Sequence, residues 1–180
     1  MKNLKISQLN YKDINQISLW DELYNNDPRF DSIKKYVLED NAYWNLYELI
    51  EINYEKFEIG ENEKKIALTL KNEQNEILGF LLGIVTDIKE KQPELIIQYL
   101  TINPEHQKQG LGKYFLKEIL QNSKKYLGTE TKKYFTRIDS SNYPSRKTFS
   151  SLGFNFTYTN SNFLVATLNT QENYKEWNYE

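Results

Sequence analysis

A strand, a helix and a second strand follow one another between residues 95 and 138, and this alternation limits the folds open to the chain. Residues 95–102 form an apolar run that stops at Asn103-Pro104. Residues 110–127 then place apolar side chains on one stripe at helical spacing, and residues 134–138 return to a strand pattern. A strand–helix–strand connection favours parallel neighbours in one sheet. The segment therefore predicts an α/β protein with a parallel strand pair.

Hairpin patterns flank this unit on both sides. Residues 66–70 and 77–85 alternate around a polar link, and a second pair of strands surrounds Asn160-Ser161-Asn162. Since hairpins are antiparallel, the central sheet should be mixed. The expected strands are residues 4–9, 66–70, 77–85, 95–102, 134–138, 154–159 and 163–168, and the expected helices begin at the N-cap Asp13 and span residues 31–57, 110–127 and 142–152. We expect one domain over residues 1–168, with 1–63 and 66–168 as its two parts, and a polar tail over 169–180.

Composition excludes several kinds of chemistry. The 180 residues include no Cys and one His, which excludes disulfides, a Cys nucleophile and a multi-His metal cluster. No apolar run approaches the roughly 18–20 residues that cross a bilayer, and the N-terminus lacks the apolar stretch of a signal peptide. These features predict a soluble cytoplasmic protein that binds neither metal nor membrane. The sequence pI of 5.6 disfavours nucleic-acid binding.

Two glycines open the helix that follows the apolar strand. Gly110 and Gly112 lie where the helix begins, and Gln107, Lys108 and Gln109 precede them in a polar loop. The first turn of a helix leaves amide N–H groups without intrahelical partners, and the helix dipole adds partial positive charge there. Glycine lacks Cβ, so a ligand can approach the backbone closely. We therefore predict a pyrophosphate site at this junction.

Other nucleotide loops fit the same residues poorly. The segment lacks the Gly-x-x-x-x-Gly-Lys-Ser/Thr pattern of a Walker A loop. It also lacks Gly-x-Gly-x-x-Gly, because Phe115 stands at the third glycine position.

The junction resembles the acetyl-CoA signature of the GNAT superfamily, Gln/Arg-x-x-Gly-x-Gly/Ala after a strand that ends in x-x-Pro. The matching residues are Gln107, Gly110 and Gly112, and they follow Ile102-Asn103-Pro104. The pattern is weak alone, but its position at a strand-to-helix junction makes it more specific. The resemblance covers residues 66–168 well and the remainder by element order.

A second segment adds to this resemblance. Family members often carry Asn-x-x-Ala-x-x-x-Tyr-x-x-x-Gly-Phe in their last helix. Asn142, Gly153 and Phe154 match that pattern, and Ser145 is a small-residue substitute for its Ala. Phe149 replaces its Tyr.

The resemblance implies a GNAT fold, with a splayed pair of strands that holds coenzyme A. Acetyl-CoA would be the co-substrate, and an acceptor amine would attack its thioester directly. The strand before the signature would pair with the pantetheine arm as an added strand, and Asn142 would hydrogen-bond that arm. The residues expected to bind coenzyme A are Leu100, Ile102, Gln107, Lys108, Gln109, Gly110, Leu111, Gly112, Lys113, Asn142 and Ser145.

Two positions depart from the catalytic residues of the family. Phe149 stands where a Tyr commonly protonates the leaving thiolate, and Phe has no proton to give. Ile96 stands where histone-type members carry a Glu as base. Glu94 and Gln98 are the nearby candidates, although Gln98 would only orient water. His106 belongs to the loop on the phosphate side, so we interpret it as an exposed loop histidine rather than a base.

The acceptor is less constrained than the co-substrate. Residues 1–63 hold 13 acidic and 7 basic side chains, while residues 104–147 hold 4 and 10. This asymmetry suits a cationic acceptor and an anionic co-substrate, but two solvated faces explain it equally well. Trp20, Trp44 and Tyr47 either shape the acceptor pocket or, in the interpretation we prefer, pack in the core. The partners expected are a small-molecule amine or a peptide, with exposed edge strands suited to a homodimer.

Three hypotheses follow from the sequence. The first is an N-acetyltransferase that acts on a small molecule or a peptide. The second is a non-catalytic acyl-CoA-binding or regulatory module of the same fold, suggested by Phe149 and by the lack of an evident base. The third is an unrelated nucleotide-binding α/β protein.

Overall fold

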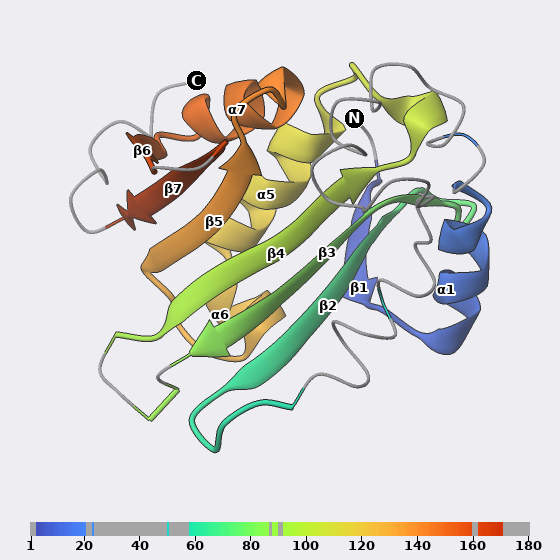
Figure 1. Cartoon of the computed structure of the whole chain (residues 1–180). Coiled ribbons are helices and arrows are strands. Elements are labelled where there is room, and N and C mark those ends of the chain that lie inside the picture. The colour runs from blue at the N-terminus through green and yellow to red at the C-terminus, as the bar shows by residue number, and fades with distance from the viewer. Residues whose placement is uncertain are drawn as a thin grey trace.

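Seven strands form one mixed sheet in the part of the chain that the structure, a computed structural model, describes (Figure 1). That part comprises residues 3–20, 23, 50, 58–86, 88–89, 92–159 and 162–170. The strands are β1 (Lys5–Gln8), β2 (Lys64–Lys71), β3 (Ile77–Thr86), β4 (Glu94–Ile102), β5 (Lys133–Asp139), β6 (Asn155–Tyr158) and β7 (Phe163–Asn169), in the spatial order β1-β2-β3-β4-β5-β7-β6. The helices are α1 (Tyr11–Ser18), α5 (Leu111–Gln121), α6 (Ser123–Leu127) and α7 (Tyr143–Ser150), with a 3-10 turn η3 (Pro104–His106). The prediction of a mixed sheet of about seven strands with flanking helices is confirmed.

One neighbouring pair of strands is parallel. β4 and β5 run in the same direction, and α5 and α6 form the connection between them. The other neighbouring pairs of described strands are antiparallel. The strand–helix–strand pattern of the sequence therefore has the geometry expected of it.

The parallel pair separates before either strand ends. Pairing between β4 and β5 stops at Ile97↔Thr136. Beyond that point residues 98–102 of β4 remain on the edge of β3, and residues 137–139 of β5 remain paired with β7. Figure 1 shows β4 and β5 side by side at their lower ends and diverging toward their upper ends. We call residues 98–102 and 137–139 the splay.

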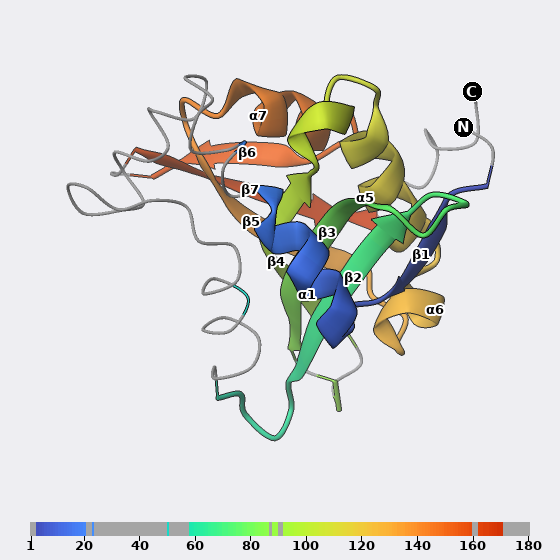
Figure 2. The same cartoon turned by 90° about the vertical axis from the view of Figure 1, so that its right-hand side faces the viewer.

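Apolar clusters on the two faces of the sheet hold the helices in place. The larger cluster includes Phe115, Leu116 and Ile119 of α5, each with no exposed surface. Burying one such side chain stabilises the fold by about 1.5–3 kcal/mol. The smaller cluster includes Ile14 and Ile17 of α1 on the opposite face. Figure 2 shows α1 and α6 on opposite sides of β2. We call these two surfaces the α5 face and the α1 face.

The first helix begins earlier than the sequence predicts. Its N-cap is Asn10 rather than Asp13, and Asp13 lies at the third helical position. Asn10 Oδ1 accepts from Asp13 N at 3.2 Å, while Asp13 Oδ2 accepts from Asn10 N at 3.0 Å. Each side chain therefore caps the other's backbone, which is the reciprocal arrangement of a capping box. Both residue types favour caps, and this is why the sequence alone chose the wrong one.

The helix predicted over residues 110–127 is divided into α5 and α6. Asn122 leaves helical geometry with φ −123° and ψ 39°, and its side chain donates to Glu118 O at 3.2 Å. Asn competes for backbone partners in this way, so it can interrupt an otherwise continuous helix. Gly128 follows α6 in the left-handed region, with φ 83°, so the second helix ends where the predicted helix ends.

Some predictions lie outside the described residues. They are the helical segment 31–57, apart from Ile50, with Trp44 and Tyr47 in it, and most of the tail beyond Asn169. Trp20 is described, and it packs in the core of the α1 face with its ring 6.1 Å from that of Phe80. No helix in the described ranges is long and apolar enough to cross a bilayer.

Candidate active site

The loop after β4 is folded by its own polar side chains. Asn103 Oδ1 accepts from Glu105 N at 3.1 Å and caps the turn η3, while Asn103 N donates to Leu78 O at 2.9 Å. Gln107 Nε2 donates to Ile102 O at 3.3 Å and so joins the end of the loop to the end of the strand. The side chain of Gln107, which the sequence predicts to bind coenzyme A, thus stabilises the loop that leads to the glycine segment.

The histidine of this loop has a partner in another turn. His106 Nε2 lies 2.8 Å from Glu76 Oε1, just before the start of β3. The interaction connects the loop to the β2–β3 hairpin. This placement agrees with the interpretation of His106 as a loop histidine, and it gives the residue a role in holding the loop.

The glycine segment exposes a row of backbone amides. Gly110 is the N-cap of α5 and has φ 77°, and Lys108 also lies in the left-handed region with φ 62°. Among the described residues, Tyr114 is the first in this row whose amide has a backbone acceptor, Gly110 O at 2.9 Å. The amides of residues 108–113, which we call the amide row, therefore remain available at the positive end of the helix dipole. Successive backbone N–H groups in a turn with left-handed residues can form a concave anion-binding surface.

The side chains around these amides divide into two groups. Lys108, Gln109 and Lys113 have solvent-accessible side chains, so their polar groups can reach a phosphate. Leu111 is buried and anchors the first turn of α5 in the core. In the same turn, partial burial raises the pKa of the Tyr114 phenol above its ordinary value of 10.0, and the nearby Glu118 carboxylate adds to the rise. The Tyr114 hydroxyl is therefore protonated at neutral pH.

A β-bulge interrupts β4 where the splay begins. Leu82 pairs with Tyr99 and Gly83 pairs with Ile97, so Gln98 is an extra residue in β4. A Cβ on Gly83 would lie 2.6 Å from Ile96 O, so the close approach of the strands requires glycine there. The bulge bends β4 and disrupts the ladder locally. Gln98 Oε1 is buried and has no hydrogen-bond partner among the described residues.

Helix α7, the last in the described element order, packs against α5 and so brings the second family segment beside the first. Asn142 Oδ1 accepts from Ser145 N at 3.2 Å and caps α7. Its amide nitrogen is therefore the group that can reach a ligand. Phe149 is 3% exposed and meets the Phe154 ring edge-on at 4.9 Å. The side chain at the Tyr position of the family thus belongs to the core.

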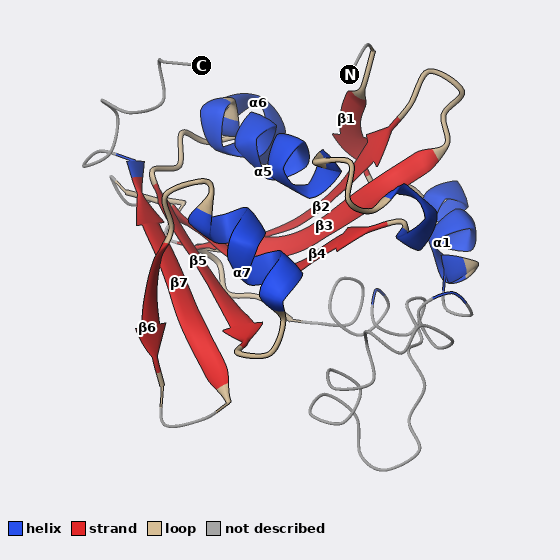
Figure 3. Cartoon of the chain, turned by 90° about the horizontal axis from the view of Figure 1, so that it is seen from above, coloured by secondary structure: helices blue, strands red, loops and turns tan. Residues whose placement is uncertain are grey.

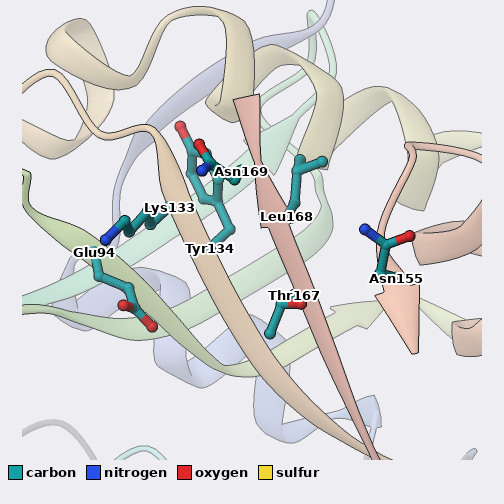
Figure 4. Close-up of a pocket in the computed structure, with 7 residues that line it drawn as sticks. All are labelled: Glu94, Lys133, Tyr134, Asn155, Thr167, Leu168 and Asn169. Carbon is teal, nitrogen blue, oxygen red and sulfur yellow. The ribbon is translucent and has the colours of Figure 1, made fainter. Parts of the chain in front are cut away.

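Glu94 lies apart from these residues. It is the first residue of β4 and pairs with Lys133, the first residue of β5. Gln98 lies four positions after Glu94, which is about 13 Å along a strand. Glu94 instead lines a shallow pocket of about 210 Å³ at this end of the sheet, together with Lys133, Tyr134, Asn155, Thr167, Leu168 and Asn169 (Figure 4). Of the two catalytic candidates, the structure brings only Gln98 to the splay.

Asp139 is a polar residue at the splay that belongs to no sequence motif. It ends β5, and the residue is 6% exposed. The sequence signal for it is modest: an acidic residue directly after an apolar strand, three residues before Asn142. Within the described ranges, no group of three or more His, Cys, Asp or Glu side chains is placed to hold a metal ion.

Comparison with solved structures finds the same fold in several acetyltransferases, whereas comparison with curated proteins by sequence finds no match. The ribosomal-protein-S18-alanine N-acetyltransferase of Escherichia coli has a TM-score of 0.59 and 17% identity, over 92% of this chain and 93% of that one. Spermidine N-acetyltransferase from Vibrio cholerae, in complex with CoA and spermine, has a TM-score of 0.61 and 18% identity, over 93% and 95%. An acetyltransferase from Thermus thermophilus has a TM-score of 0.63 and 15% identity, over 93% and 97%.

These likenesses concern the fold, because each identity is low. Evidence for the family comes from the sequence of the chain itself. Residues 20–154 match the Acetyltransferase (GNAT) family, and this range includes the bulged strand, the amide row and the last helix. The chain therefore belongs to the GNAT acetyltransferase family.

Proposed function

We propose that this chain is an acetyl-CoA-dependent N-acetyltransferase that transfers an acetyl group to a primary amine of a small molecule or a peptide. One observation carries the proposal. The amides of residues 108–113 and the edge of residues 98–102 from which β5 has diverged lie at the same end of β4. A ligand with a pyrophosphate at one end and an extended amide-bearing arm needs both surfaces.

The amide row and the splay together fit such a ligand. The amides of residues 108–113 would hold the pyrophosphate. The edge of β4 near Leu100 and Ile102 would bind the arm as an added strand, because the ladder with β5 ends before it reaches them. The amide nitrogen of Asn142 would donate to the same arm. Acetyl-CoA supplies the acetyl group as a thioester, whose carbonyl carbon an amine can attack.

The protein would contribute mainly position and hydrogen bonds. An amine must lose a proton before it attacks, and Gln98 would orient the water that carries this proton away. A backbone N–H near Leu100 would stabilise the charge that develops on the carbonyl oxygen. Phe149 cannot protonate the departing sulfur, but a thiol of pKa about 8.5 leaves without an acid. Holding the two substrates together supplies much of the acceleration.

The structural neighbours suggest the range of acceptors. One acts on the alanine of a ribosomal protein and another on spermidine, so the fold serves both peptide and polyamine amines. The acidic balance of residues 1–63 favours a cationic acceptor. A homodimer through the edge strand β6 and a cytoplasmic location stay predictions.

A second candidate function is a non-catalytic acyl-CoA-binding module. The observation that favours it is Phe149, which is packed in the core and offers no acid. The module would bind the same ligand at the same residues and would differ only in the absence of turnover.

Two measurements separate these functions. Calorimetric titration with acetyl-CoA should show binding, and a thiol-release assay with spermidine, kanamycin and an alanine-terminated peptide should show turnover with at least one amine. Binding without release of thiol from a wide amine panel would favour the module. Absence of any heat of binding at millimolar acetyl-CoA would exclude both functions.

A further inference from the structure

Asp139 has one satisfied carboxylate oxygen and one that is not. Its Oδ1 accepts from Ser141 N at 2.7 Å and from Ser141 Oγ at 2.5 Å. Its Oδ2 is buried and has no hydrogen-bond partner among the described residues. A buried carboxylate oxygen without a donor is unfavourable, and in native proteins such a group calls for a ligand or another explanation.

The position of Asp139 relates this oxygen to the splay. Asp139 pairs with Phe163 on its β7 side, while its other side lies beyond the last β4–β5 pair, Ile97↔Thr136. Its neighbour Ile138 belongs to the cluster of the α5 face. Because successive residues of a strand face opposite sides, Asp139 lies on the α1 face.

This face is not the one on which the pyrophosphate is expected. Leu111 and Phe115 pack α5 against the opposite side of the sheet, so the amide row at its first turn belongs to the α5 face. An acceptor that approaches from the α1 face would reach the splay without crossing the surface proposed to bind acetyl-CoA. Asp139 therefore lies on the side suited to the acceptor.

A second unpartnered acceptor comes from the other strand. Gln98 Oε1 and Asp139 Oδ2 are two of the three buried side-chain oxygens without a partner in the described part of the chain. One belongs to the bulge of β4 and the other to the end of β5, so each side of the splay supplies one. Both are hydrogen-bond acceptors, and an ammonium group offers three donors and no acceptor.

We propose that Asp139 Oδ2 binds the amino group of the acceptor, that Gln98 Oε1 accepts a second N–H from it, and that the acceptor is a cationic primary amine. This inference rests on the proposed N-acetyltransferase function and names its amine site. The charge of Asp139 distinguishes the amino group from the neutral amides of the pantetheine arm, because a carboxylate forms its strongest hydrogen bonds with cationic donors. Asp139 positions the amine, and the proton that the amine loses passes to water.

The test is Asp139→Asn, which keeps Oδ1 and the side-chain shape but replaces Oδ2 with a donor. The probes are spermidine, titrated by calorimetry into the protein saturated with non-hydrolysable desulfo-CoA, and desulfo-CoA alone. The dissociation constant for spermidine should rise at least about tenfold, because a charge-assisted hydrogen bond is lost. The constant for desulfo-CoA should stay within about twofold, since the amide row and the β4 edge are unchanged. General damage to the fold would weaken the binding of both probes, so a loss of spermidine affinity alone would not arise from it.

Two further variants keep the test decisive. Gln98→Met preserves side-chain size and should weaken spermidine binding while sparing desulfo-CoA. Ser141→Ala removes a contact of Oδ1 but leaves Oδ2, so spermidine binding should change by less than about threefold. The same affinity for spermidine in Asp139→Asn and wild type, or no spermidine binding by wild type that binds desulfo-CoA, overturns the amine site. Loss of desulfo-CoA affinity in Asp139→Asn would overturn it as well, and would assign Asp139 to the pantetheine arm. Failure of wild type to bind desulfo-CoA at all would remove the proposed function itself.

Discussion

At the scale of single residues, the amide row depends on backbone conformations that most side chains avoid. Gly110 has φ 77°, yet no atom lies within 4 Å of the place where a Cβ would stand. Steric crowding within the protein therefore does not explain glycine at this position. The left-handed backbone explains it, together with space for a ligand if the pyrophosphate binds there.

Gly110→Glu should weaken the binding of acetyl-CoA about 100-fold. A carboxylate beside a pyrophosphate adds like-charge repulsion of about 3 kcal/mol, which corresponds to about 100-fold in the dissociation constant. Calorimetric titration measures the effect. Gly128→Glu is the matched control, because Gly128 has φ 83° at the far end of α6 and the same charge would be added there. Both variants should lose about 1 kcal/mol of stability through the left-handed backbone, but only Gly110→Glu should lose affinity for the ligand. A dissociation constant in Gly110→Glu within about threefold of the wild-type value would contradict the assigned site.

At the scale of elements, α1 is held to the sheet by a buried ion pair. Lys71 Nζ at the end of β2 lies 2.6 Å from Asp13 Oδ1, and the two side chains are only 11% and 4% exposed. Asp13 also caps the first turn of α1 through its other oxygen. One carboxylate thus fixes both the start of the helix and its position on the sheet.

Asp13→Asn should destabilise the protein by about 3 kcal/mol, because it leaves the Lys71 charge buried without an opposite charge. Urea unfolding measures the free energy. Adding Lys71→Met to this variant removes the stranded charge and should recover at least half of the loss. Glu130→Gln breaks the exposed pair of Glu130 with Lys132 and should change stability by less than about 0.5 kcal/mol. A loss below about 1 kcal/mol in Asp13→Asn would show that the buried pair contributes little.

At the scale of the whole molecule, the sheet consists of two groups of strands that share a short junction. β1 to β4 form one group and β5, β7 and β6 the other, and only the register from Glu94↔Lys133 to Ile97↔Thr136 joins them. α5 and α7 pack in the cluster of the α5 face, which draws side chains from both groups. Figure 3 shows α7 between the two groups when the sheet is seen from above. A ligand in the splay would touch both groups.

Acetyl-CoA at about 100 times its dissociation constant should raise the melting temperature by about 5–10 °C. The reason is that binding to the native state alone adds about 2.7 kcal/mol, and each kcal/mol shifts a chain of this size by about 2–4 °C. Differential scanning calorimetry checks the shift, and the same ligand concentration should shift Gly110→Glu by less than about 2 °C. A wild-type shift below about 2 °C at that ligand excess would show that bound ligand does not stabilise the native fold as a whole.

The parts of this architecture that could be predicted from sequence are local. The end of β4 at Asn103-Pro104 and the glycines before α5 act through the backbone of a few consecutive residues. Apolar periodicity likewise identified the strands, because burial on one face requires it. The fold and the position of the amide row follow from such signals.

The parts that could not be predicted depend on contacts between distant segments. The bulge at Gln98 arises from the pairing of β4 with β3, and Gly83 is its only trace in the sequence of β3. A reader of the sequence who does not know of the bulge has no reason to prefer Gln98 over Glu94 as the residue at the splay. The register of β4 with β5 distinguishes the two positions. Asp139 shares its burial with Asp13 but differs from it in having a carboxylate oxygen without a partner among the described residues, and no sequence pattern displays either property.

The bulge in β4 also indicates how such a site can arise during evolution. Ile97 packs in the cluster of the α5 face and Tyr99 against that of the α1 face, so the strand would alternate correctly if Gln98 were absent. A descendant that lost this single codon would keep its interior and straighten its strand. The bend and the polar group at its apex are therefore separable from the regular ladder around them, and evolution can revise them without disturbing the core.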